Sequence, residues 1–319
     1  MAPISLARCS RVVPEPKGWA RASKRRECGR GELLTVQEQS LQAGLYVVAT
    51  PIGTARDITL RALDILASAD VLAAEDTRNT RKLMDIHGIA LGGRPLVAYH
   101  DHNGAKQRPR LLGYIRDGKS VAYVSDAGTP LVADPGFALV RDAVAEGLAV
   151  TSAPGPSALL AALAVAGLPT DRFLFAGFLP PKTTARQTEL RKLADIPATL
   201  VFFESGKRIG NCLSDMVHVL GSDRPAALCR ELTKKFEEVR RGTLSELMDF
   251  YASDAPRGEI VLVVGPPVPH ALDRQGVADM VMAARQTAGS LRDAVDQVTA
   301  ASGWPRKAVY KLALEQEDS

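Results

Sequence analysis

The chain has 319 residues, of which 46% are hydrophobic and 24% are charged, a composition that is typical of a globular protein with a sizeable core. It contains no apolar run of the roughly 18 residues that a membrane-spanning helix needs, and its N-terminus lacks the apolar segment of a secretory signal. Its four cysteines form no CxxC pair, which argues against a zinc site or a disulfide framework and favours a reducing, cytoplasmic setting.

The formal net charge of +4 comes from one end of the chain. Residues 1–43 hold eight of the 40 Lys and Arg residues and four of the 36 Asp and Glu residues, so the rest of the chain is electrically balanced. RNA binding by the body of the protein would therefore need a local basic patch. Because residues 1–43 also lack apolar periodicity, we expect them to form a disordered basic extension.

From Gly44 onward, short apolar strands alternate with helices of about ten residues, which predicts an α/β fold with a parallel sheet in an N-terminal domain at 44–170. The strands are apolar throughout, as expected when helices cover both faces of a sheet. The expected strands are 45–50, 70–75, 95–100, 119–125 and 148–154. The expected helices are 59–69, 76–88, 137–147 and 157–167, and 101–118 is expected to be a loop followed by a helix.

The second half of the chain predicts a C-terminal α/β domain at 171–268 with a mixed sheet and fewer crossovers. Its expected strands are 173–179, 199–205, 225–231, 239–244 and 258–265, and its expected helices are 184–195 and 208–221. Residues 276–319 predict a helical hairpin appendage, with helices at 290–301 and 305–316.

Polar and Pro/Gly-rich segments follow the strands of the first domain. They are TPIG (50–53), EDTR (75–78), HDHN (100–103), SDAGTP (125–130) and APGPS (153–157). Ligands of open parallel sheets bind beyond the carboxyl ends of the strands, so this concentration predicts a binding site in the first domain.

These segments suggest different chemical roles. Gly128 lets the backbone approach a ligand closely, and Pro130 stiffens the same turn. Pro156 and Ser157 open a helix whose free N–H groups attract a carboxylate or a phosphate. The simpler alternatives are an Asx-turn at Asp126 and an ordinary helix start at PGPS.

Other candidates leave more than one reading open. His100 and His102 lack a third ligand, so hydrogen-bonding loop residues are favoured over a metal site, and we expect no bound metal. Glu204, at the end of a strand, either binds a ligand across the cleft between the domains or starts a helix. The fingerprints of a dinucleotide-binding turn and of a P-loop, GxGxxG and GxxxxGK[ST], are absent.

The order of short motifs along residues 44–267 closely resembles the bacterial ribosomal RNA small subunit methyltransferase I family, which belongs to the tetrapyrrole-methylase-like class III methyltransferases. The motifs are TPIG, AAEDTR, HDHN, VSDAGTP, PGPSA, GFLP, FES, RELTK and GEIVLVV. Tetrapyrrole relatives carry GxGPGD where this chain has TPIG. The chain departs from the usual pattern at Thr54, where Asn is common, and at FESGKR, which lacks a Pro-His pair and leaves the roles of Lys207 and Arg208 open.

The resemblance implies two α/β domains with S-adenosylmethionine bound in the cleft between them. It also implies a homodimer that methylates the ribose 2′-hydroxyl of a cytidine in the decoding region of small-subunit (16S) ribosomal RNA. The cofactor contacts would be Pro51, Ile52, Gly53, Ser125, Asp126, Ala127, Gly128, Thr129, Pro130, Pro154, Gly155, Pro156, Ser157 and Glu204. A tetrapyrrole methyltransferase and a non-catalytic RNA-binding module remain the alternatives.

Methyl transfer to a hydroxyl needs a base that removes its proton. The candidates are Glu75, Asp76, His100, His102, Glu204 and Lys234. The EDTR and HDHN segments are favoured, and Lys234 is eligible only if its pKa is lowered. The RNA backbone would be met by Arg78, Arg230, Arg306, Lys307 and Lys311; the last three lie on the second helix of the hairpin, which could equally be a packing element.

Overall fold

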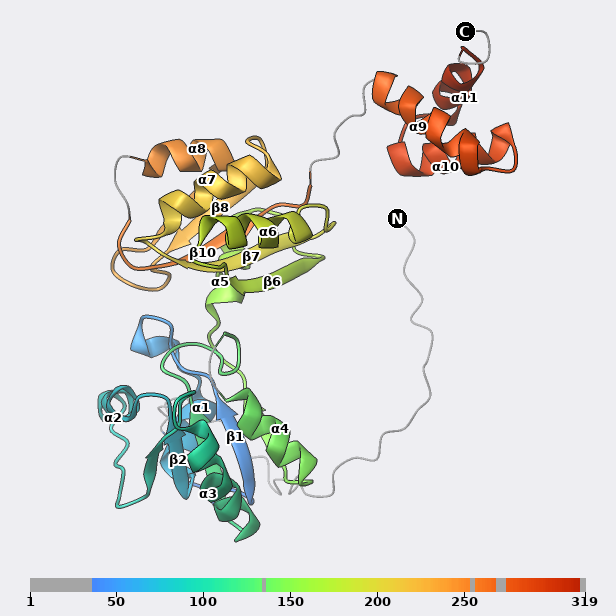
Figure 1. Cartoon of the computed structure of the whole chain (residues 1–319). Helices are drawn as coiled ribbons and strands as arrows, with labels where there is room; N and C mark the ends of the chain where they lie inside the picture. The colour runs from blue at the N-terminus through green and yellow to red at the C-terminus, as the bar shows by residue number, and fades with distance from the viewer. Residues whose placement is uncertain (1–35, 134–135, 253–255, 268–273, 316–319) are drawn as a thin grey trace, which may run out of the picture. The chain divides into compact units, whose positions relative to one another are not determined.

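The computed structural model describes residues 36–133, 136–252, 256–267 and 274–315 (Figure 1). The predicted extension at 1–43 lies outside the described residues except for 36–43. The backbone N–H groups of Gln37 and Gln39 donate to the side chains of Asp64 and Ser68, so the last part of that segment is attached to the first domain. No helix in the described ranges has the length and apolar character needed to cross a bilayer.

The first sheet is parallel throughout, as the sequence predicts. Its strands are β1 (Gly44–Val48), β2 (Val71–Ala74), β3 (Leu96–Ala98), β4 (Ser120–Val124) and β5 (Val150–Ala153), in the order β3-β2-β4-β1-β5. The chain leaves β1 towards β2 and leaves β4 towards β5, in opposite directions. The crevice that this reversal opens between β1 and β4 is where open α/β sheets bind ligands.

Helices follow these strands where the periodicity predicts them. They are α1 (Leu60–Ser68), α2 (Thr77–Ile86), α3 (Gly104–Arg116), α4 (Phe137–Ala145) and α5 (Ala158–Ala166), with a 3₁₀ turn η1 at Ala55–Asp57. Local chemistry sets their ends: the Thr59 hydroxyl accepts from the Ala62 N–H at the start of α1, and Gly88, at φ +69°, follows the end of α2. Capping side chains and left-handed glycines are the expected helix boundaries.

The second sheet is mixed, which confirms the predicted α/β fold class with its two kinds of sheet. Its strands are β6 (Phe173–Phe178), β7 (Thr199–Ser205), β8 (Pro225–Arg230), β9 (Glu238–Thr243) and β10 (Glu259–Val264), in the order β6-β7-β10-β8-β9. β6 and β7 pair in parallel, and the other pairs are antiparallel. The helices are α6 (Thr183–Leu193), α7 (Ile209–Leu220) and α8 (Leu244–Tyr251).

Helix α8 was not predicted, and the strand expected at 239–244 ends one residue earlier. A capping box starts the helix: the Thr243 hydroxyl accepts from the Glu246 N–H at 3.2 Å, and the Glu246 carboxylate accepts from the Thr243 N–H at 2.8 Å. This reciprocal pair satisfies two N–H groups that would otherwise lack partners, so a short segment of eight residues becomes helical.

The two faces of the second sheet are covered by different helices (Figure 1). Leu200 and Phe202 of β7 face the core formed with α6, α7 and α8, whereas Val201 and Phe203 face α5. Helix α5 precedes the expected domain boundary in sequence, yet Ala162, Leu163 and Ala166 pack against the second sheet. The other side of this apolar helix stays open, since Leu160 is 56% exposed and Val165 is 36% exposed.

Within the described residues 274–315 there are three helices rather than the predicted hairpin: α9 (Arg274–Thr287), α10 (Leu291–Ser302) and α11 (Arg306–Glu315). They share a core of their own, made by Val277, Val281, Val295, Val298, Val309 and Leu312. Helix α9 was missed, although Val277, Val281 and Ala284 have helical spacing.

Candidate functional site

The TPIG and SDAGTP turns are joined by two backbone hydrogen bonds. The Thr50 N–H donates to the Gly128 carbonyl at 2.9 Å, and the Gly128 N–H donates to the Thr50 carbonyl at 3.0 Å. The buried hydroxyls of Ser125 and Thr50 add bonds to the carbonyls of Gly128 (2.8 Å) and Ser125 (3.2 Å). Gly128 sits at φ +78°, which only glycine adopts without strain. The stiff polar turn seen in the sequence is therefore one half of a two-turn unit.

The PGPS turn lies beside this pair. The Thr129 hydroxyl donates to the Pro156 carbonyl at 2.9 Å, and the Thr59 hydroxyl donates to the Pro154 carbonyl at 3.4 Å. A Cβ on Gly155 would lie 3.0 Å from the Ala49 Cβ, so glycine allows this close approach. Three segments that are far apart in sequence thus meet at the carboxyl end of the first sheet, as predicted.

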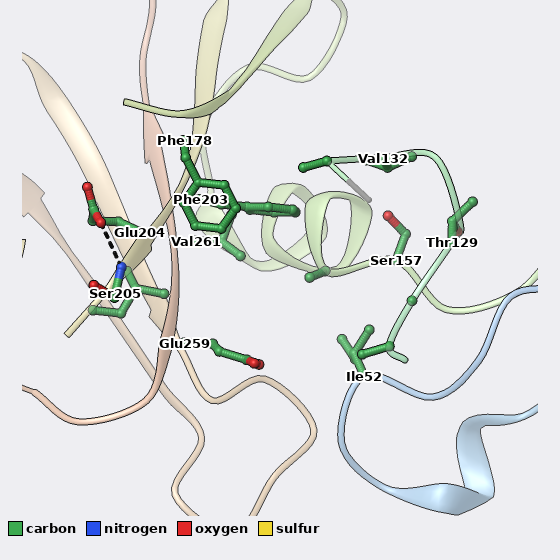
Figure 2. A pocket seen from close by; sticks show the side chains of 15 residues that line it. Ile52, Thr129, Val132, Ser157, Phe178, Phe203, Glu204, Ser205, Glu259 and Val261 are labelled. Carbon is green, nitrogen blue, oxygen red and sulfur yellow. Dashed lines mark hydrogen bonds between the residues drawn. The ribbon is translucent and has the colours of Figure 1, made fainter. Parts of the chain in front are cut away.

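A cavity of about 370 Å³ opens between these turns and the second sheet. Figure 2 shows Ile52, Thr129 and Ser157 on one side, with Phe178 and Phe203 opposite them. The rings of Phe178 and Phe203 meet edge to face, 5.7 Å apart. Of the predicted cofactor contacts, those that line this cavity are Ile52, Ala127, Gly128, Thr129, Ser157 and Glu204.

Phe178 and Phe203 are not among the site residues that the sequence predicts. Both occur in motifs of the family resemblance, GFLP and FES, but only as strand residues. The alternation of side chains along a strand could have identified Phe203. Phe203 lies on the same face of β7 as Val201, which packs against α5. That face leads into the cavity.

The same parity places the Glu204 carboxylate on the opposite face. Its Oε2 lies 3.1 Å from the Arg208 guanidinium, and its Oε1 accepts from the Ser205 N–H at 2.8 Å. Figure 2 shows the carboxylate directed away from the cavity. Helix α7 starts at Ile209, after Arg208. Neither a carboxylate contact to the cofactor nor a helix start is supported, and Glu204 lines the cavity without directing its carboxylate into it. Arg208 also donates to the Leu179 carbonyl, which makes its role structural.

The other predicted contacts fall elsewhere. Pro51, Gly53, Ser125 and Asp126 line a second cavity of about 320 Å³ beside α2. Gly155 and Pro156, with Ile52 and Ser157, line a third of about 310 Å³. In the described part of the chain, Pro130 and Pro154 line none of these three cavities.

Carboxylates cluster where α2 begins. Asp126 accepts from the Asp76 N–H at 3.0 Å and from the Asn79 amide at 3.1 Å, so it anchors α2 instead of forming the Asx-turn that was the simpler alternative. The Arg78 side chain donates to Asp76 and holds the pKa of that carboxyl at about 2. Burial, reinforced by the charge of Asp126, raises the pKa of Glu75. A raised pKa makes Glu75 a stronger base than Asp76.

The two histidines belong to a hydrogen-bonded loop. The His100 N–H donates to the Asn103 side chain at 3.0 Å, and the His100 ring lies 3.1 Å from the Asn103 amide nitrogen. The His100 and His102 rings are 6.0 Å apart. In the ranges that the structure describes, no group of three or more His, Cys, Asp and Glu side chains is arranged to hold a metal ion.

Lys234 is paired with two carboxylates, Glu231 at 3.0 Å and Glu259 at 2.8 Å. Burial alone would lower its pKa, but the two ion pairs outweigh burial and raise it. The lowered pKa that a lysine base requires is therefore not present. The same loop touches the TPIG turn, because a Cβ on Gly53 would lie 2.5 Å from the Thr233 hydroxyl.

Some of the basic residues predicted to contact RNA are free to bind a phosphate, whereas others are held in ion pairs. Arg78 is 89% exposed at its side chain, and Lys307 and Lys311 are exposed on α11. Arg306 pairs with Asp296 at 2.6 Å. Arg230 is held by Glu238 at 3.1 Å and by the Arg257 carbonyl at 2.9 Å, which argues against a phosphate contact from this residue.

Comparison with known proteins identifies the family of this chain. Residues 44–248 match the family model of the Tetrapyrrole (Corrin/Porphyrin) Methylases. The ribosomal RNA small subunit methyltransferase I of Mesorhizobium japonicum is 48% identical over 285 residues, covering 89% of this chain and 96% of that protein. The protein of the same name from Escherichia coli O157:H7 is 42% identical over 278 residues, covering 86% and 96%.

Solved structures show the shared fold at lower identity. A cobalt precorrin-4 methyltransferase matches with a TM-score of 0.53 and 21% identity, over 69% of this chain and 94% of that chain. A diphthine synthase matches with a TM-score of 0.51 and 17% identity, over 69% and 89%. The predicted family is thus confirmed: this chain belongs to the tetrapyrrole (corrin/porphyrin) methylases and, among them, to the ribosomal RNA small subunit methyltransferase I family.

Proposed function

We propose that the protein uses S-adenosylmethionine to methylate the ribose 2′-hydroxyl of a cytidine in the decoding region of small-subunit (16S) ribosomal RNA. Relatives that share 42–48% of their residues with most of this chain carry the corresponding name. The observation that carries the proposal is the cavity of about 370 Å³ above the bonded TPIG and SDAGTP turns.

The residues present suit this methyl donor. A cavity of this volume is in the range for small-molecule sites. Phe178 and Phe203 offer apolar ring surfaces for an adenine, and Thr129 and Ser157 offer hydroxyls for its ribose. Ser157 precedes α5 without a side-chain cap, so the first N–H groups of that helix are available to the carboxylate of the methionine part. When bound, the donor supplies a methyl group on a positively charged sulfur.

The protein's own part in the reaction is orientation and proton removal. Holding donor and hydroxyl in line supplies much of the acceleration in such a transfer. We assign proton removal to Glu75, because its raised pKa favours proton uptake and because it lies in the EDTR segment at the carboxyl end of β2. A positioned base contributes roughly 10²–10⁴-fold.

Three further parts of the proposal concern partners and setting. Lys307 and Lys311, both exposed, would contact RNA phosphates. We also infer that the protein acts in the cytoplasm and as a homodimer, in line with the family resemblance. The side chains of Phe236 and Phe137, which are 62% and 68% exposed, suit a protein interface. Light scattering on the purified protein would give twice the chain mass if the homodimer forms.

Mass spectrometry of small-subunit RNA tests the activity. Nucleosides are compared from cells with and without this protein, and from purified subunits incubated with the protein and the donor. The proposal predicts 2′-O-methylcytidine only where the protein is present. Methylation of a base instead of a ribose, or no change, would contradict it.

A further inference from the structure

The second cavity, of about 320 Å³, is lined by other residues of the same two turns that line the first. In the TPIG turn, Ile52 lines the first cavity, while Pro51 and Gly53 line the second. In the SDAGTP turn, Gly128 lines the first and Asp126 lines the second. The two cavities therefore adjoin at these two turns, so a molecule in the second cavity lies beside the donor cavity.

Helix α2 supplies the rest of the wall. Asn79, Leu83 and Ile86 have the i, i+4, i+7 spacing of one helix face, and Thr80 and Lys82 join them in lining the cavity. The wall thus combines an amide, a hydroxyl, a cation and two aliphatic side chains. Ile86 is 56% exposed, and Lys82 forms no ion pair with any described residue, so neither is committed to another contact.

The Thr80 hydroxyl is the least expected feature of this wall. The residue is 2% exposed, and its Oγ1 has no hydrogen-bond partner among the described residues. In helices, threonine hydroxyls commonly bond to a carbonyl of the preceding turn. A buried hydroxyl without a partner destabilises the fold, so its presence in a cavity wall is explained if a ligand supplies the partner.

We propose that this second cavity binds the acceptor nucleotide of the RNA substrate, extruded from its stack. This inference rests on the proposed function and adds the subsite to it. RNA is read most readily from unstacked bases, and enzymes that modify nucleotides inside structured nucleic acid take them out of the stack. Leu83 and Ile86 would pack against the base, Thr80 and Asn79 would bond to its polar atoms, and Lys82 would meet the phosphate.

The charges of the wall favour a nucleotide over a tetrapyrrole. A tetrapyrrole carries many carboxylates and needs several cations, whereas the described wall offers one cation, Lys82, beside the Asp126 carboxylate. A nucleotide brings one phosphate and an otherwise neutral surface. The charge of Asp126 also acts on Glu75, so the assigned base lies next to this cavity.

Two variants and a matched control test the subsite. Thr80→Val removes the hydroxyl at nearly constant shape, and Lys82→Gln removes the cation. Lys119→Gln removes an exposed cation directly before β4, at the amino end of the sheet and away from the cavity. Fluorescence anisotropy measures binding of a labelled 12-nucleotide single-stranded RNA containing cytidine at several salt concentrations, and calorimetry measures S-adenosylmethionine binding.

We expect Thr80→Val to weaken RNA binding about fivefold, the effect of one lost hydrogen bond, without lowering thermal stability. Lys82→Gln should weaken RNA binding and flatten the salt dependence by about 0.7 in log–log slope, the value for one phosphate contact on a single strand. Lys119→Gln should change neither, and all three proteins should bind the donor like the wild type.

The subsite is refuted if Thr80→Val binds the RNA as the wild type does, or if Lys82→Gln and Lys119→Gln have equal effects. A wild type that does not bind the RNA also refutes it. These outcomes are separate from the proposed function, which fails if the wild type binds no donor or transfers no methyl group to small subunits.

Discussion

Replacing Gly128 by alanine perturbs the turn that joins the two halves of the proposed donor site. At φ +78° an alanine is strained by about 1–2 kcal/mol. Its Cβ would also lie 3.3 Å from the Ile52 Cγ2, so Ile52 must move within the cavity wall, which adds about 1 kcal/mol of overpacking. We expect a total loss of about 2–3 kcal/mol in the free energy of unfolding.

Gly88→Ala provides the matched control. Gly88 has a similar φ of +69°, and an added Cβ there would meet nothing within 4 Å. The backbone strain is therefore similar, about 1–2 kcal/mol, but the cavity is untouched. With roughly 2–4 °C of melting temperature per kcal/mol at this domain size, Gly128→Ala should melt a few degrees below Gly88→Ala.

Donor binding separates the two variants. Movement of Ile52 together with the new methyl group should weaken S-adenosylmethionine binding roughly tenfold, or about 1.4 kcal/mol, in Gly128→Ala, while Gly88→Ala binds like the wild type. Isothermal calorimetry at a temperature where both proteins are folded measures this difference. Equal donor affinity in the two variants would refute the assignment of the turn to the donor site.

Three further predictions concern buried charges and thiols. Removing Asp215, which pairs with the buried Arg186 at 2.7 Å, should cost about 3–5 kcal/mol in urea denaturation; a loss below about 1 kcal/mol would contradict a buried ion pair. Glu75 has a raised pKa, so its ionised form destabilises the fold once the pH exceeds that pKa. Glu75→Gln should therefore melt above the wild type at pH 8 and lose this advantage near pH 4, and an equal gain at both pH values would contradict the shift. Burial raises the pKa of Cys212 to about 12 and of Cys229 to about 11, so mass spectrometry should find both unlabelled by a thiol reagent at pH 8 in the native protein.

Much of the first domain could be predicted because its signals are local. Each apolar strand is followed by a turn and an amphipathic helix, and parallel strands place all those turns at one edge of the sheet. That rule alone brings Gly128 and Pro156 to the same site, although it does not say which turns form hydrogen bonds with each other.

The second half of the site depends on information that is not local. Nothing near α5 in the sequence indicates that it covers the second sheet, and so the surface that Phe203 presents to the cavity was not foreseen. Glu204 was assigned to the cofactor because it ends a strand, but the alternation of side chains in β7 turns its carboxylate to the other face. The partners of Lys234, which raise its pKa, come from Glu231 and from Glu259 on β10, and such pairs depend on tertiary structure.

The most direct test is a crystal structure of the protein with S-adenosylmethionine or its demethylated product. We expect the adenosine to contact the SDAGTP turn and the start of α5, with Phe203 against the ligand, and the reactive sulfur to point towards the second cavity. A ligand bound elsewhere, with the space between Ile52 and Phe203 left to solvent, would contradict it.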